Sequence, residues 1–150
     1  MKNIYYSIAF YIIIIIKTII IGMVLPNKGS NPFTINDKSF VEVIITFFFV
    51  SIIETLLFNF MLNKGLSKIS FLKKYEYIII FISSILFGAS HLNNLGNIKF
   101  FISSFLSGIF YNINFYLYWK TDKKVQNAII STSGLHFAHN LTIYLIDICL

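Results

Sequence analysis

The sequence predicts an all-α membrane protein, a polytopic transmembrane helix bundle of about five spans. Of its 150 residues, 57% are hydrophobic and only 12% are charged, a balance far from that of a soluble globular domain. The apolar residues also fall in long runs, and a helix needs about 20 of them to cross the hydrocarbon core of a bilayer. At this length we expect a single membrane domain over residues 1–150.

The first apolar run, near residues 4–25, predicts an uncleaved membrane helix. It is longer than the hydrophobic region of a normal signal peptide, and no A-x-A-like cleavage site follows it. We therefore expect residues 1–38 to form an extra N-terminal span and its loop, and residues 39–150 to form the core of the protein.

Four further runs predict the spans of this core, near residues 39–63, 75–95, 98–119 and 126–148. Polar segments separate them. Residues 26–38 carry Pro, Gly and Asn, while residues 64–74 and 120–124 carry most of the charge. Residues 92–97 read Leu-Asn-Asn-Leu-Gly-Asn, a polar turn that ends a helix between the third and fourth spans.

The basic residues predict the orientation in the membrane. All 12 are lysines, eight of which fall at the N-terminus and in the 64–74 and 120–124 segments, against three on the opposite side. The positive-inside rule then places the protein in the cell membrane with its N-terminus cytoplasmic and its C-terminus outside. Because the lysines flank apolar runs, we expect lipid as a partner and no nucleic acid.

Titratable groups deep within spans are functional candidates, because burying them in lipid is expensive. Lys17 can snorkel to the interface, whereas Glu54, His91 and His136 cannot. Counting about 1.5 Å per residue from the cytoplasmic end places Glu54 and His136 about 15 Å deep, and Asn140 and His91 about 21–24 Å deep. One site can hold all four, although a membrane His or Asn also often serves as an interhelical hydrogen bond.

Three stretches carry a family resemblance: Ile-Glu-Thr-Leu-Leu-Phe-Asn over 53–59, Phe-Gly-Ala-Ser-His over 87–91 and His-Phe-Ala-His-Asn over 136–140. They resemble the motifs E-E-x-x-x-R, F-x-x-x-H and H-x-x-x-N or H-x-x-x-D of the CPBP family, the Abi-like CAAX proteases and bacteriocin-processing enzymes. The second and third motifs match in full, Phe87 included. In the first, Thr55 and Asn59 replace Glu and Arg, and we expect a neutral Thr–Asn hydrogen bond in place of an ion pair.

The resemblance implies that Glu54, His91, His136 and Asn140 are catalytic. Glu54, the only carboxylate deep in a span, is the candidate general base for a water, which His91 would share. His136 and Asn140 would donate hydrogen bonds to the oxyanion.

A divalent metal such as zinc would have His91 and His136 as candidate ligands. A catalytic zinc usually has three protein ligands and still needs a base, which argues against a tightly bound one. A third imidazole, His139, lies outside the family motif, and we expect it to serve helix packing.

The resulting hypothesis is an intramembrane endopeptidase whose partner is a membrane-embedded peptide or protein substrate, in bacteriocin maturation, self-immunity or CAAX-type processing. One alternative is a catalytically inactive relative that acts as an immunity or peptide-binding membrane protein. The other is a small ion or proton transporter, against which the lack of a second intramembrane acid argues. Gly88 and Gly108 are expected to permit close helix approach.

Overall fold

The structure is a computed structural model that describes residues 2–25, 39–92 and 98–149. The predicted all-α class is confirmed, since no β-strand occurs within those ranges. The elements in chain order are α1 (Lys2–Val24), α2 (Phe40–Glu54), the π-helix η1 (Thr55–Met61), α3 (Leu62–Leu66), the 3₁₀-helix η2 (Leu72–Lys74), α4 (Glu76–Ser90), α5 (Ile98–Asp122) and α6 (Val125–Cys149).

Each of the five expected runs contains a helix. Three helices are long and apolar enough to cross a membrane, namely Asn3–Val24, the continuous helix Phe40–Leu66 that comprises α2, η1 and α3, and α5. The helix α4 is apolar but only 15 residues long, so the span expected over 75–95 ends earlier, at Ser90. At 25 residues α6 is long enough to cross a membrane, but it is less apolar than the three helices just named. The expected 26–38 loop and residues 93–97 of the expected turn lie outside the described residues.

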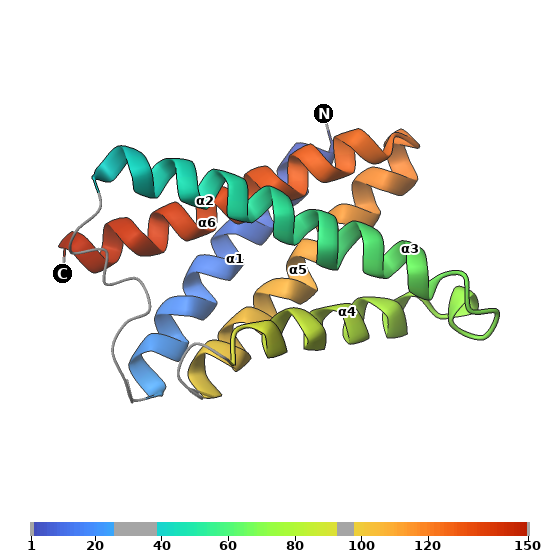
Figure 1. The fold of residues 1–150 in the computed structure, drawn as a ribbon, viewed down its shortest axis with the longest axis horizontal. Coiled ribbons are helices and arrows are strands. Elements are labelled where there is room, and N and C mark those ends of the chain that lie inside the picture. The colour runs from blue at the N-terminus through green and yellow to red at the C-terminus, as the bar shows by residue number, and fades with distance from the viewer. Residues whose placement is uncertain (1, 26–38, 93–97, 150) are drawn as a thin grey trace.

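The helix α5 forms the centre of the bundle, where it contacts α1, α4, α6 and η1. In Figure 1 the continuous helix over 40–66 crosses in front of α1 and α5, and α6 runs beside its first half. The apolar core lies where these helices meet and includes Ile14, Phe87, Tyr111 and Leu135. Two members of this core, Phe87 and Tyr111, also border the candidate site.

Two local features fix the helices that carry the site. The second helix begins with a capping box, in which the Ser39 side chain accepts from the backbone N–H of Glu42 and the Glu42 side chain accepts from that of Ser39. The helices α4 and α5 meet closely, since a Cβ atom on Gly88 would lie 2.9 Å from Cβ of Phe105. Gly108 is equally confined, as its Cβ would lie 3.0 Å from the Phe87 ring. The expected close approach at both glycines is confirmed.

A polar stripe explains the π-helical segment. Ser51, Thr55, Asn59 and Asn63 follow one another at intervals of four residues, and all four are buried. An α-helix has 3.6 residues per turn, so a spacing of four drifts by about 40° at each step and by about 120° over the stripe. The π-helix pairs each backbone group with one five residues away and so winds less tightly. We infer that η1 absorbs the drift and keeps the stripe facing the bundle.

The end of this stripe holds α3 against its neighbours. The Asn63 amide donates to Asn112 Oδ1 of α5 at 2.7 Å, and the Asn63 oxygen accepts from Ser83 of α4 at 2.7 Å. Asn112 in turn donates to Ser84 Oγ at 3.2 Å. These four side chains are all fully buried. Side-chain hydrogen bonds of this kind are the usual adhesive between membrane helices, so they fix how α3 and α4 lie relative to each other.

Candidate active site

The Glu54 carboxylate lies between two imidazoles. It belongs to the last residue of α2, and its Oε2 lies 3.3 Å from Nε2 of His136 on α6. Its Oε1 lies 4.0 Å from Nε2 of His91, the residue that follows α4. The Glu54 side chain is 21% exposed, that of His91 24% and that of His136 only 4%. Three separate helices thus bring together the acid and the two imidazoles that the sequence singled out.

The hydrogen bonds of His91 define which of its ring nitrogens carries a proton. Its Nδ1 lies 2.9 Å from the carbonyl oxygen of Phe87, and the Ser90 hydroxyl donates to that same oxygen at 2.7 Å. A carbonyl only accepts, so Nδ1 carries the hydrogen and the Nε2 of the neutral ring presents a lone pair to Glu54. His91 Nε2 and Glu54 Oε1 are then two acceptors 4.0 Å apart, and a water molecule between them can donate one hydrogen to each.

The ring of His136 is held by aromatic contacts. The ring of Tyr111 on α5 stacks on it with centroids 4.5 Å apart and planes at 29°, and the edge-on ring of Phe87 lies 5.6 Å away. Its Nδ1 is buried and has no hydrogen-bond partner in the described part of the chain. Nε2 is therefore the ring nitrogen that faces a polar group, and that group is the Glu54 carboxylate.

Asn140 lies one turn along α6 from His136 and faces the same region. Its amide is 3.5 Å from Ser51 Oγ, at the outer limit of a hydrogen bond, and Ser51 precedes Glu54 by one turn of α2. The Asn140 amide is thus only weakly hydrogen-bonded. It remains free to donate to another acceptor.

The expected hydrogen bond between Thr55 and Asn59 is wrong. Within the described residues the buried Thr55 hydroxyl has no hydrogen-bond partner, and the Asn63 amide donates to the backbone carbonyl of Asn59 at 2.6 Å. The expectation assumed the side-chain alignment of residues four apart in an α-helix. The two residues do share the buried face of the polar stripe, but sharing a face does not by itself bring the two side chains into hydrogen-bond contact.

The third imidazole, His139, directs its bonds away from Glu54. Its Nδ1 lies 2.7 Å from the Tyr111 hydroxyl on α5, and its Nε2 lies 3.2 Å from Thr18 Oγ1 on α1. The side chain is 9% exposed. This placement agrees with the helix-packing role expected of it.

A catalytic zinc at this site would need Glu54 as its third ligand and would then leave no base. Over residues 2–25, 39–92 and 98–149, no group of three or more His, Cys, Asp or Glu side chains is placed to hold a metal ion. Nε2 of His91 and Nε2 of His136 face different oxygens of the Glu54 carboxylate. A zinc would require these atoms to converge on one point, with a base left over.

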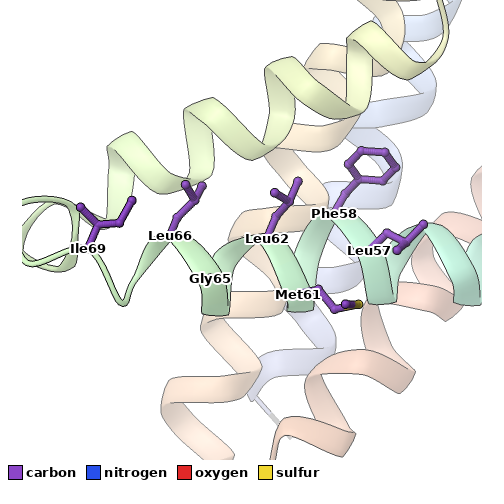
Figure 2. A pocket seen from close by; sticks show the side chains of 7 residues that line it. All are labelled: Leu57, Phe58, Met61, Leu62, Gly65, Leu66 and Ile69. Carbon is purple, nitrogen blue, oxygen red and sulfur yellow. The ribbon is translucent and has the colours of Figure 1, made fainter.

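An apolar groove lies along η1 and α3. It has a volume of about 580 Å³ and begins three residues after Glu54. Figure 2 shows the side chains of Phe58, Leu62 and Leu66 on the side of this helix that faces α4. The ring of Phe58 packs edge-on against that of Phe87 at 5.4 Å, so the groove adjoins the aromatic wall of the site. Its lining residues are Leu57, Phe58, Met61, Leu62, Gly65, Leu66 and Ile69.

Sequence reasoning missed two residues of this neighbourhood, Tyr111 and Ser51. Tyr111 belongs to α5, the span without a family motif, and one more aromatic residue among 17 Phe and 9 Tyr carries no signal by itself. Its spacing was informative, because Ser104, Gly108, Tyr111 and Asn112 lie on one helical face. Ser51 could have been found from its four-residue spacing to Thr55 and Asn59.

A helical membrane bundle that holds a carboxylate between two imidazoles agrees with the class that the motif resemblance implied, the CAAX-type intramembrane proteases, and the three motifs lie at this centre. The chain belongs to the family described as Type II CAAX prenyl endopeptidase Rce1-like, whose sequence model matches residues 36–142. This match confirms the resemblance to the CPBP family. No curated protein and no solved structure matches the chain. The matched range contains all three motifs and excludes α1.

Proposed function

We propose that the chain is an intramembrane endopeptidase that hydrolyses a peptide bond of a membrane-associated peptide or protein. The observation that carries this proposal is the Glu54 carboxylate at 3.3 Å from one imidazole nitrogen and 4.0 Å from another, within a helical membrane bundle. Membership of a family of CAAX-type proteases supports it.

The first step is activation of water. A water molecule between Oε1 of Glu54 and the Nε2 lone pair of His91 donates one hydrogen to each, which orients its oxygen lone pair toward a bound peptide carbonyl. Glu54 takes the first proton as the oxygen attacks the carbonyl carbon, as a general base does. The carbonyl oxygen then carries the negative charge of a tetrahedral intermediate.

The second step is stabilisation of this oxyanion. When Glu54 becomes protonated, its attraction for the His136 N–H falls, and that N–H can donate to the new negative oxygen beside it. The Asn140 amide, weakly held by Ser51 at 3.5 Å, supplies a second donor. Transfer of the proton from Glu54 to the amine nitrogen then breaks the peptide bond and restores the carboxylate.

The substrate we propose carries an apolar chain next to the scissile bond. The groove that adjoins the site is lined by aliphatic and aromatic side chains and a glycine, which suits an isoprenyl chain and excludes a charged one. The family's description as prenyl endopeptidases points the same way. CAAX-type processing is therefore favoured over bacteriocin maturation as the role of the site.

A specific observation favours the alternative of an inactive, peptide-binding relative. The first motif lacks its second Glu and its Arg, and the Thr55 hydroxyl in their place has no partner within the described residues. If the lost ion pair is needed to hold Glu54, the chain would bind a substrate without cleaving it. The two functions differ in whether Glu54 is required.

The test measures cleavage of prenylated and unprenylated C-terminal peptides by purified protein in detergent, with mass spectrometry of the products. Glu54→Gln, His91→Ala and His136→Ala are each expected to abolish cleavage while the protein remains folded. The matched control is Glu76→Gln, which changes an exposed carboxylate paired with Lys120 outside the site. Full cleavage by Glu54→Gln would overturn the proposal. Peptide binding without cleavage by the unmodified chain would establish the inactive relative.

A further inference from the structure

Tyr111 connects the candidate site to the opposite side of the bundle. Its ring stacks on the imidazole of His136 at 4.5 Å, and its hydroxyl lies 2.7 Å from Nδ1 of His139. The side chain is only 1% exposed, so both contacts lie inside the bundle. One residue therefore contacts the ring that faces Glu54 and the imidazole that does not.

The direction of each hydrogen bond in this chain of contacts follows from donor counting. The Thr18 hydroxyl has one hydrogen, and it donates to the Ile14 carbonyl oxygen at 2.9 Å. Thr18 must then accept from His139 Nε2, which consequently carries the imidazole hydrogen. The Nδ1 of a neutral His139 is left as an acceptor, so Tyr111 is the donor.

The chain of bonds ends in α1, which lies outside the family match over 36–142. Thr18 belongs to this helix, as does Lys17, whose ammonium donates to the carbonyl oxygen and the hydroxyl of Ser103 and to the hydroxyl of Ser107. Lys17 therefore does not snorkel as the sequence suggested, because α5 offers acceptors for all three of its hydrogens. These bonds fix α1 against α5 at the level of Tyr111.

We propose that Tyr111 and His139 are positioning residues that hold the His136 ring in the plane from which it faces Glu54, and that α1 completes this unit through Thr18. The inference rests on the proposed proteolytic function and identifies further residues on which it depends. Stacking alone leaves the tyrosine ring free to slide, and the hydroxyl bond to His139 removes that freedom. Small displacements of a catalytic group cost up to about 100-fold in rate.

The activity experiment compares two tyrosines. Tyr111→Phe removes a hydroxyl bonded to α6 through His139, and the control Tyr11→Phe removes one bonded to α6 through Thr142. We expect both variants to lose similar thermal stability, while only Tyr111→Phe lowers kcat, by about 10-fold and without a change in KM. Thr18→Val, which removes the hydroxyl, should also lower kcat. Thr18→Ser, which keeps a hydroxyl, should leave kcat unchanged. Equal effects on kcat at the two tyrosines would overturn the proposal.

A second readout does not depend on activity. The chain has 3 histidines, so ¹⁵N-histidine NMR with single-histidine variants can assign each ring. We expect His139 to carry its hydrogen on Nε2, and Tyr111→Leu to shift the His136 signals through loss of the stacked ring. A hydrogen on Nδ1 of His139, or unchanged His136 signals, would refute the positioning unit. If the NMR result holds but no peptide is cleaved, the proposed function fails and the unit stands.

Discussion

The contact between α4 and α5 supports a quantitative prediction for Gly88→Ala. The new Cβ would lie 2.9 Å from Phe105 Cβ, 3.0 Å from the Phe101 carbonyl oxygen and 3.1 Å from the Phe105 backbone nitrogen. Two of these atoms are backbone, so side-chain rotation cannot relieve the clash and the helices must separate. Overpacking of this kind costs about 1–3 kcal/mol, and better helix propensity returns about 0.5–1 kcal/mol.

The net expectation for Gly88→Ala is a loss of up to about 2.5 kcal/mol in the free energy of unfolding, with a middle value of roughly 1 kcal/mol. For a chain of this size, about 1 kcal/mol corresponds to roughly 2–4 °C in Tm. The assay is thermal unfolding of the purified protein in detergent. Gly88 lies one turn before His91, so separation of the helices should also widen the 4.0 Å approach to Glu54 and lower activity.

The matched control is Gly134→Ala in α6, where a Cβ would meet nothing within 4 Å. This variant should be as stable as the unmodified chain or slightly more stable, because alanine favours the helix. The reasoning is refuted if Gly88→Ala and Gly134→Ala unfold at the same temperature. A lower Tm for both would show instead that helical glycines matter here for a reason other than close approach.

Three further predictions concern the site and the orientation. Asn140→Ala should lower kcat by about 10²–10³-fold, the usual worth of one oxyanion donor, and so less than Glu54→Gln; complete loss would give the amide another role. Elemental analysis should find no stoichiometric zinc, and chelators should leave cleavage intact; a bound zinc that activity requires would make His91 and His136 ligands. The lysine distribution predicts that Cys149, the single cysteine, reacts with an impermeant maleimide on intact cells, and labelling only after lysis would reverse the orientation.

Much of the fold could be predicted because membrane helices leave a strong signal. A length of about 20 apolar residues is imposed by the bilayer, and the polar segments between runs mark their ends. The weaker cases were α4, which ends at Ser90, and α6, whose polar site residues sit in a less apolar helix. Depth along each helix, counted at about 1.5 Å per residue, was enough to indicate that Glu54, His91 and His136 could meet.

The parts of the site that could not be predicted depend on contacts between helices. No sequence motif records that the Tyr111 ring lies flat on His136, because stacking depends on the rotation of α5 about its axis. The same applies to His139, whose bonds to Tyr111 and Thr18 join three helices. The spacing of a motif shows which residues share a face of one helix. Which side chains of different helices contact each other is determined by how the helices pack.

The departure in the first motif shows that two residues on one helix face need not bond to each other. Thr55 and Asn59 were expected to bond to each other and do lie together in the buried polar stripe, yet the Thr55 hydroxyl has no partner within the described residues. Thr55 is fully buried, so a glutamate there would place an uncompensated charge beside Glu54, at a cost of several kcal/mol, roughly 3–5. An arginine alone at Asn59 would carry the same penalty. The neutral residues Thr55 and Asn59 avoid this penalty. The polar stripe remains buried because its position depends on the four-residue spacing and not on charge.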